Sequence, residues 1–326
     1  MSALLETRGL TKHFALRRGQ TVHAVDEVSL AIDDREVVGL VGESGSGKST
    51  FGRTLVGLLE KTAGEVYFAG ERLPAKYRPA DFQRYASRVQ MIFQDPYSSL
   101  NPRMTVGEII GEGLRLAPGR KVAQIRDEVG DWLVRVGLER NHASRYPHEF
   151  SGGQRQRVGI ARALIVRPRF VVCDEPISAL DVSVQAQIVR LLGELKSSLG
   201  LTMLFIAHDL SMVRYVSDRM AVMYLGALVE IGPANEVYSR PLHPYTQILI
   251  GSNPQPDPRS ERRRTATAIK GEIASPINVG VGCRFASRCP RVMDVCRTVT
   301  PALQTIEQQP SARRVACHLY PASPRA

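Results

Sequence analysis

The segment Gly42–Ser49, with the sequence GESGSGKS, constrains the fold of this chain more than any other, because it matches the pattern GxxxxGK[ST]. A strand-like run, Glu36–Val41, precedes it, and a helix-like stretch, Ser49–Leu59, follows it. In that setting the glycines allow successive backbone N–H groups to face phosphate oxygens, and Lys48 adds a positive charge. The segment therefore predicts a phosphate-binding loop. A glycine-rich turn that merely precedes a helix does not explain why Lys48 and Ser49 stand in register.

The same loop identifies the groups expected to bind the phosphates of a nucleotide and its metal ion. Lys48 is expected to approach the β- and γ-phosphates, and the hydroxyl of Ser49 is a ligand for Mg²⁺. The predicted phosphate-binding residues are Gly42, Ser44, Gly45, Ser46, Gly47, Lys48, Ser49 and Thr50.

A second apolar run, Phe170–Cys173, ends in two carboxylates, Asp174 and Glu175. In isolation, two acidic residues before Pro176 would be read as the end of a strand. With the phosphate loop upstream, they predict a second catalytic element. We expect Asp174 to reach the Mg²⁺ shell and Glu175 to polarise the attacking water.

Apolar runs and helix-like stretches alternate along most of the chain. Phe170–Cys173 is followed by the helical stretch Val182–Leu199 and then by the strand-like run Thr202–Ala207. This alternation predicts an α/β fold with a parallel sheet. The Pro-rich and charged stretch Asn253–Arg264 reads as a linker, so we expect a first domain at 1–255 and a small extension at 256–326.

Composition narrows the class of protein further. The chain has 326 residues, and no apolar run approaches the ~18 residues that cross a bilayer. The N-terminus lacks the pattern of an export signal, so we expect a cytoplasmic location. The net charge of +11 is compatible with nucleic acid, an anionic membrane surface or phosphate-bearing ligands, and the basic residues are spread along the chain.

A third motif, Ser151-Gly-Gly-Gln154, opens another helix-like stretch and offers free backbone N–H groups to an anion. Here the chain resembles the ATP-binding cassette (ABC) superfamily, whose signature reads LSGGQ, with Phe150 in place of the leucine. The resemblance implies a P-loop NTPase with a RecA-like core, an antiparallel β subdomain and a helical subdomain at about 97–165. It also implies that Ser151, Gly152, Gly153 and Gln154 bind the ATP held by a second cassette, so a dimer is expected.

Other positions match the order and spacing of the superfamily. Gln94 resembles the glutamine that contacts Mg²⁺ and the attacking water and that senses the membrane partner. Ser178-Ala-Leu-Asp181 resembles the loop across the dimer interface, and His208 resembles the histidine that contacts the γ-phosphate. Phe14 occupies the place of the aromatic residue that stacks on adenine, although a core phenylalanine is the alternative.

Three segments resemble the ATPases of oligopeptide and dipeptide importers in particular. They are the stretch from Gln94 to Val106, the sequence Pro241-Leu-His-Pro-Tyr245, and a cysteine-containing extension after Gly282. The resemblance implies ATP as the substrate, two separate integral membrane permease subunits, a second ATPase subunit and an extracytoplasmic peptide-binding protein. It places the chain at the cytoplasmic face of the membrane, with no nucleic acid partner. Nickel, glutathione and cationic peptides remain alternative cargoes, and a soluble ATPase acting on nucleic acid or ribosomes is the alternative from another class.

Four cysteines crowd into the extension: Cys283, Cys289, Cys296 and Cys317. Their spacing lacks the CxxC pairs of common zinc sites, yet four thiolates could enclose zinc or an iron–sulfur cluster, or remain unligated. The resemblance implies a 4Fe-4S cluster.

The remaining cysteine, Cys173, is expected to be a small core residue. Arg288 and Arg291, which flank Cys289, and the triplet Arg262, Arg263 and Arg264 could offset thiolate charge or contact lipid head groups, but we expect a solvated surface for all of them.

Overall fold

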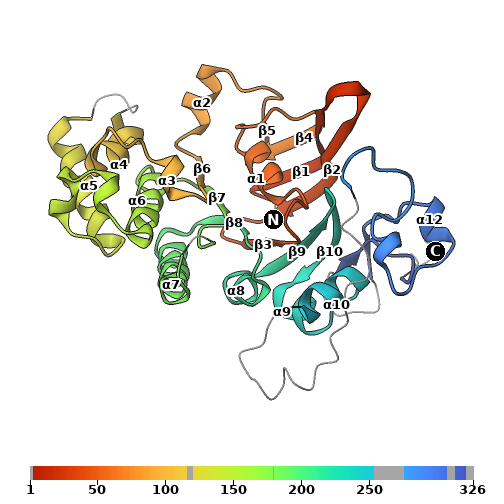
Figure 1. Ribbon diagram of the computed structural model, residues 1–326. Helices are drawn as coiled ribbons and strands as arrows, with labels where there is room; N and C mark the ends of the chain where they lie inside the picture. The colour runs from red at the N-terminus through yellow and green to blue at the C-terminus, as the bar shows by residue number, and fades with distance from the viewer. Residues whose placement is uncertain (1–2, 116–119, 179, 253–274, 307–312, 321–326) are drawn as a thin grey trace, which may run out of the picture.

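The computed structural model describes residues 3–115, 120–178, 180–252, 275–306 and 313–320 (Figure 1). Within them, the larger sheet has the strand order β11-β12-β10-β9-β3-β8-β7-β6. Its central part is parallel and consists of β9 (Arg219–Tyr224), β3 (Val37–Val41), β8 (Thr202–Ile206), β7 (Phe170–Asp174) and β6 (Val89–Ile92). The predicted parallel α/β sheet is therefore confirmed.

Helices shield this sheet, and every residue of β3, β7 and β8 is buried. Such strands need cover on both faces, which explains why they are apolar apart from Thr202 and Asp174 at strand ends. The helices around the sheet are α1 (Lys48–Leu55), α7 (Val182–Leu199), α8 (Leu210–Val216), α9 (Ala234–Ser239) and α10 (Pro244–Gly251). The first of these is shorter than the predicted stretch to Leu59, whereas α7 has the predicted bounds.

A second, antiparallel sheet has the order β2-β1-β4-β5. Its strands are β2 (Thr21–Ile32), β1 (Leu5–Ala15), β4 (Ala63–Phe68) and β5 (Glu71–Arg72), and η1 (Arg17–Gly19) connects the first two along the chain. Phe51 and Leu55 of α1 share one buried cluster with Leu10, Val25 and other residues of this sheet. The helix that follows the phosphate loop is thus held between the two sheets (Figure 1).

A group of helices projects from the far end of the larger sheet (Figure 1). Trp132 and Leu133 are buried in its core with Ile109 and Ile110. The apolar faces of these helices therefore pack against one another and form a core without strands. The elements between β6 and β7 are α3 (Pro96–Ser99), α4 (Val106–Arg115), α5 (Val122–Arg135), η2 (Arg140–Ser144), η3 (Pro147–Glu149) and α6 (Gly152–Leu164). Another helix, α2 (Pro79–Tyr85), precedes β6.

The described part of the extension, residues 275–306 and 313–320, lies against the cassette at the opposite end (Figure 1). Its β12 (Arg314–Val315) pairs with β10 (Ala227–Pro233), and Ile277 forms a bridge with Val22 of β2. Its other elements are η4 (Ala286–Arg288), α12 (Val295–Thr298) and β11 (Gln304–Thr305). The predicted linker Asn253–Arg264 lies outside the described residues.

None of the described helices combines the length and the apolar character needed to cross a membrane.

Candidate functional site

The phosphate loop joins β3 to α1, and Lys48 closes it from inside. Its ammonium donates to the backbone carbonyls of Gly42 and Glu43, each at 2.9 Å. The side chain is buried, and burial lowers the pKa of its ammonium. Gly47 has a φ of 104°, and a Cβ there would lie 2.0 Å from the carbonyl oxygen of Ala24. The close approach of β2 therefore requires glycine at this point of the loop.

Ser49 and Asp174 meet at the start of α1. The Ser49 hydroxyl donates to Asp174 Oδ1 at 2.7 Å, and the carboxylate of Asp174 is fully buried. Its other oxygen, Oδ2, has no hydrogen-bond partner among the described residues, although Arg53 Nη2 lies 3.6 Å away. Burial is the main cause that raises the pKa of Asp174. A buried carboxylate oxygen without a partner, beside a hydroxyl, suits a hard cation such as Mg²⁺.

Gln94, Glu175 and His208 follow the carboxyl ends of β6, β7 and β8, which are neighbours in the sheet. Parallel strands present their carboxyl ends at one edge, so the three side chains converge there. Gln94 Nε2 donates to Glu175 Oε2 at 2.8 Å, and His208 Nδ1 lies 3.9 Å from the same oxygen. A small cavity of about 30 Å³ adjoins Glu175 and His208 and is also lined by Ser178.

Glu175 itself has a φ of 44°, in the left-handed region. A residue that carries a Cβ pays for this conformation, which is typical of residues held in place for function.

Ser151 caps α6, the helix that begins with the SGGQ motif. Its hydroxyl accepts from the Gln154 backbone N–H at 3.3 Å, and the Gln154 side chain accepts from the Ser151 N–H at 2.9 Å. Ser151 and Gly152 are exposed, and no hydrogen bond within the described residues connects them to the phosphate loop. The structure therefore leaves this helix start open to a partner instead of bringing it to Lys48.

Two arginines of α6, which sequence reasoning missed, connect that helix to the segment after Gln94. The Arg155 guanidinium lies 3.8 Å from the centre of the Tyr97 ring, and Arg162 donates to the carbonyl of Ser99. The segment after Gln94 is therefore in direct contact with the SGGQ helix.

Phe14 and Asp181 are both exposed. Phe14 lies at the end of β1 with 37% of its surface accessible, and Lys12 Nζ lies 4.7 Å from the centre of its ring. Its exposure is at odds with the alternative of a core phenylalanine. Asp181 precedes α7, and its side chain makes no capping hydrogen bond.

A charged pair behind the phosphate loop is the main feature that sequence reasoning missed. Arg288 of the extension contacts both carboxylate oxygens of Glu43, each at 2.9 Å, and the Glu43 backbone N–H donates to the Tyr245 hydroxyl at 2.8 Å. The Arg288 side chain is only 4% exposed and Glu43 is 19% exposed. The pair raises the pKa of Arg288. We call Glu43, Tyr224, Tyr245, Phe285 and Arg288 the junction.

The expectation of a solvated Arg288 is therefore wrong. Arg288 stands next to Cys289, so the sequence alone relates its charge to the thiols. Its actual partner, Glu43, lies far away in the sequence, and no local pattern indicates the pairing. Arg291 is exposed as expected, and Arg262–Arg264 lie outside the described residues.

Aromatic rings in tilted and edge-to-face contact complete the junction. The ring centres of Tyr224 and Tyr245 lie 4.6 Å apart, and Phe285 lies 5.3 and 5.5 Å from them. His243, in the predicted PLHPY segment, is buried beside Phe285, and burial lowers its pKa to about 4. Glu230 accepts from the backbone N–H groups of this segment and from Arg313, so the segment has a fixed position under the extension.

The four cysteines of the extension are drawn together by its fold. Cys296 and Cys317 are buried, Cys283 and Cys289 are partly buried, and the Cys283 N–H donates to the Cys296 carbonyl at 2.7 Å. Burial raises the pKa of the Cys283 thiol to about 11 and also raises those of Cys289 and Cys317.

Cys173 lies apart from this group, fully buried in β7, where burial raises its pKa to about 12. Its place in the strand agrees with the prediction of a core residue.

A phosphate loop, a strand-end carboxylate held by a glutamine, and an exposed SGGQ helix on a separate helical unit define an ATP-hydrolysing ABC cassette. Comparison with known families agrees. The model described as "ABC transporter" matches residues 25–178, and the one described as "Oligopeptide/dipeptide transporter, C-terminal region" matches residues 229–296.

Relatives narrow the class further. The putative oligopeptide transport ATP-binding protein YkfD of Bacillus subtilis is 53% identical over 97% of this chain and 95% of its own. The oligopeptide transport ATP-binding protein OppF of Escherichia coli is 49% identical over 92% of each chain. The chain therefore belongs to the family of ATP-binding proteins of oligopeptide ABC transporters.

Solved structures show the same cassette fold. The ATP-binding cassette MJ0796, a dimer in a post-hydrolysis state bound to ADP and Pi, is 28% identical with a TM-score of 0.65, covering 71% of this chain and 98% of its own. CbiO1 of Clostridium perfringens, part of the transporter complex cbiONQ, is 27% identical with a TM-score of 0.64, covering 74% and 92%.

Proposed function

We propose that this chain is the ATP-hydrolysing subunit that drives import of dipeptides and oligopeptides through separate membrane permease subunits. The observation that carries the proposal is the convergence of Gln94, Glu175 and His208 on one sheet edge, beside the Ser49–Asp174 pair. The names of the relatives support the peptide cargo over nickel, glutathione or nucleic acid. The proposal includes two permeases, an extracytoplasmic binding protein and a peripheral position at the cytoplasmic face of the membrane.

The roles of individual residues follow from their places. Backbone N–H groups of the loop at 42–50 and the Lys48 ammonium bind the phosphates, and Phe14 stacks on adenine. Ser49 and Asp174, with Gln94, hold Mg²⁺, which screens phosphate charge when it is bound. Glu175 polarises the water that attacks the γ-phosphate and accepts its proton, and His208 contacts that phosphate.

A second cassette completes the site. Ser151, Gly152, Gly153 and Gln154 would bind the nucleotide of the partner, with Asp181 at the same interface. The exposed start of α6 supports this role, because the first turn of a helix presents backbone N–H groups that attract anions. The partner is either a second copy or a homologous ATPase. We retain the division into a cassette at 1–255, with its helical unit at about 97–165, and an extension at 256–326.

The variant Glu175→Gln tests the proposed reaction. It keeps the hydrogen-bonding reach of the side chain but removes the base, so ATP binding should persist while turnover falls at least about 100-fold. ATP binding is measured with a fluorescent analogue and turnover by phosphate release. Glu194→Gln, an exposed change on α7, is the matched control and should stay within about twofold. Full turnover in Glu175→Gln would count against the assignment.

We further propose that the four cysteines of the extension hold a 4Fe-4S cluster. Burial raises the pKa of the Cys283, Cys289 and Cys317 thiols, and backbone N–H groups of Phe285, Arg291 and Leu319 partly oppose that rise. Thiols that are buried and yet receive N–H groups suit the thiolates of a cluster.

Absorption spectroscopy and metal analysis of anaerobically purified protein test the cluster. We expect a brown protein with iron and sulfide, and loss of the colour in Cys296→Ser. Cys173→Ser, which alters the cysteine in the core strand, should keep the colour. A colourless wild-type protein without iron contradicts the cluster, and a stoichiometric amount of zinc in its place would support the alternative.

A further inference from the structure

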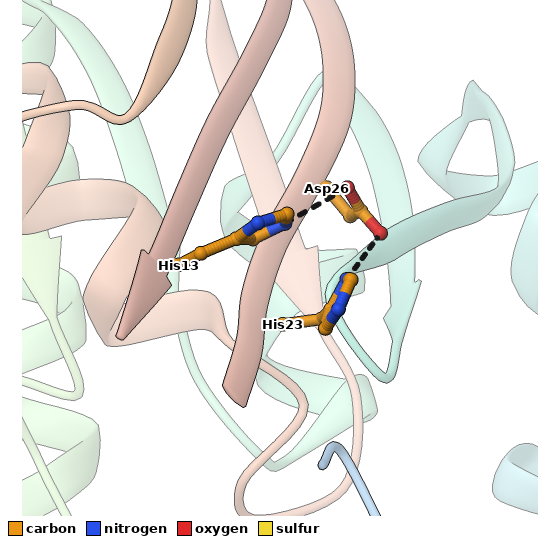
Figure 2. Close-up of side chains that lie close together, drawn as sticks. All are labelled: His13, His23 and Asp26. Atoms are coloured by element: carbon orange, nitrogen blue, oxygen red, sulfur yellow. Dashed lines mark hydrogen bonds and ion pairs between the residues drawn. The ribbon is translucent and has the colours of Figure 1, made fainter. Parts of the chain in front are cut away.

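Two histidines and an aspartate form a cluster on the antiparallel sheet, apart from the residues assigned to phosphate and magnesium. His13 of β1 and His23 of β2 are partners in the register of the two strands, and Asp26 follows on β2. Figure 2 shows the Asp26 carboxylate beside both rings, with one ring nitrogen of each directed toward it. His13 Nε2 lies 3.1 Å from Oδ1, and His23 Nδ1 lies 3.1 Å from Oδ2.

We propose that His13, His23 and Asp26 form a binding site for a divalent transition-metal ion of the zinc type. Two imidazoles and one carboxylate are ligands that suit Zn²⁺, Co²⁺ and Ni²⁺. One donor atom from each side chain lies within 4.8 Å of the other two. Ligands at about 2.1 Å from a tetrahedral ion are about 3.4 Å apart, so small rotations of the side chains suffice to close the site.

The degree of burial suits a site that exchanges its ion. The side chains of His13, His23 and Asp26 are 24%, 21% and 18% exposed. An ion can therefore enter from solvent and keep one or two water ligands, while the partial burial strengthens its attraction to the carboxylate.

Arg284 of the extension competes for the same carboxylate. Its guanidinium donates to Asp26 Oδ2 and to the carbonyl of Leu225, and its side chain is 14% exposed. The Asp26 carboxylate carries one negative charge, and a divalent ion bound to it repels the guanidinium. Metal binding therefore displaces Arg284 from Asp26.

Displacement of Arg284 connects the site to the extension. The extension also contacts β2 through the Pro276 carbonyl, which accepts from the His23 N–H at 2.9 Å. Binding of the ion removes one of these contacts and leaves the other. The cluster is thus a point at which a metal ion loosens the extension without detaching it.

Cobalt titration of the tag-free, full-length protein without nucleotide tests the site. Cobalt bound to thiolates has its own charge-transfer bands, so it is counted separately from cobalt bound to nitrogen and oxygen. We expect one ion without thiolate bands, bound at least about tenfold more weakly by His13→Gln/His23→Gln. Arg284→Gln should bind it more tightly, because it removes the competing charge. His148→Gln, which changes an exposed histidine outside the cluster, is the control and should not change the binding.

Equal affinity in the wild type and the double variant would overturn the proposal, as would weaker binding by Arg284→Gln. Circular dichroism and the thermal midpoint show whether each variant is folded. If the double variant does not fold, two single variants, His23→Gln and Arg284→Gln, decide the question. Only a metal site at this cluster predicts that His23→Gln binds cobalt more weakly and Arg284→Gln binds it more tightly.

Discussion

The nucleotide site and the junction lie on either side of the same loop, yet they differ in how far their polar side chains are exposed. At the nucleotide site Gln94, His208 and Ser151 are exposed. At the junction, the buried Arg288 pairs with both carboxylate oxygens of the partly buried Glu43. The nucleotide site leaves several of its polar side chains exposed to a ligand and a partner chain, whereas the junction pairs its charged side chains within the fold.

This difference shows how the extension can act on the cassette. Lys48 donates to the carbonyl of Glu43, whose side chain is held by Arg288, next to Cys289 in sequence. The phosphate-binding lysine and the cysteine group are thus separated by few contacts. We expect Arg288 to be a positioning residue for the loop, and the predictions below test how far the two sides depend on each other.

The largest effect is expected for Arg288→Met, which leaves Glu43 charged and half enclosed. Breaking a buried ion pair by removing one partner costs about 3 kcal/mol or more in the free energy of unfolding. Thermal and denaturant unfolding measure this cost, and KM for ATP should rise because the loop loses its support. Arg288→Lys should keep part of the stability that Arg288→Met loses. Arg291→Met, which changes a nearby exposed arginine, should alter the free energy of unfolding very little. An unchanged KM in a folded Arg288→Met protein would separate the junction from the nucleotide site.

A second effect concerns pH, through His243 beneath the extension. Burial lowers its folded pKa from 6.5 to about 4, so the unfolded chain binds more protons between these values. Stability contributed by neutral His243 is therefore present above pH 6.5 and falls by about 3 kcal/mol as pH approaches 4. Urea unfolding across this range measures the slope.

The variant His243→Asn sharpens that measurement. An asparagine can still accept from the Tyr245 N–H, as His243 Nδ1 does at 3.0 Å, but it does not titrate. The stability of His243→Asn should therefore depend less steeply on pH than that of the wild type, and the difference should equal the contribution expected for His243. An equal slope in both proteins would assign the acid sensitivity to other groups. His148→Asn, at an exposed position, should keep the slope of the wild type.

The smallest effect is expected at Phe14, on the nucleotide side. Stacking of a base on an aromatic ring is worth about 1–3 kcal/mol, so Phe14→Ala should raise KM for ATP about tenfold. Steady-state kinetics measure this change, and kcat should be nearly unaffected. Phe14→Tyr keeps the ring and should keep KM. Because Phe14 is exposed, the thermal midpoint should not fall, in contrast to Arg288→Met.

Much of the cassette could be predicted from local patterns. The runs that form β3, β7 and β8 are mostly apolar, and the loop at 42–49 carries its own glycines and lysine. Such signals depend on neighbours in the chain, which is why the strands, α7 and the phosphate loop were predicted. The meeting of Gln94, Glu175 and His208 was predicted only from a resemblance, since the order of strands is not written in any one segment.

The contacts of the extension lie beyond such patterns. Glu43 and Arg288 are 245 positions apart, and Asp26 and Arg284 are 258 apart. An isolated arginine in a basic chain reads as a solvated charge, and that reading was wrong for Arg288. Pairing between distant residues leaves no periodic signal, because it depends on where the whole fold places two surfaces.

The sequence by itself determined the chemistry of this protein: a phosphate loop, two carboxylates at the end of a strand, an SGGQ helix start and four clustered cysteines. Each is a short-range arrangement whose residue types and spacing are sufficient to specify it. Only the tertiary structure decided which of the charged groups would be open and which would be paired. That choice belongs to the packing of the extension against the cassette, because burial penalises an unpaired charge and so selects partners from anywhere in the chain.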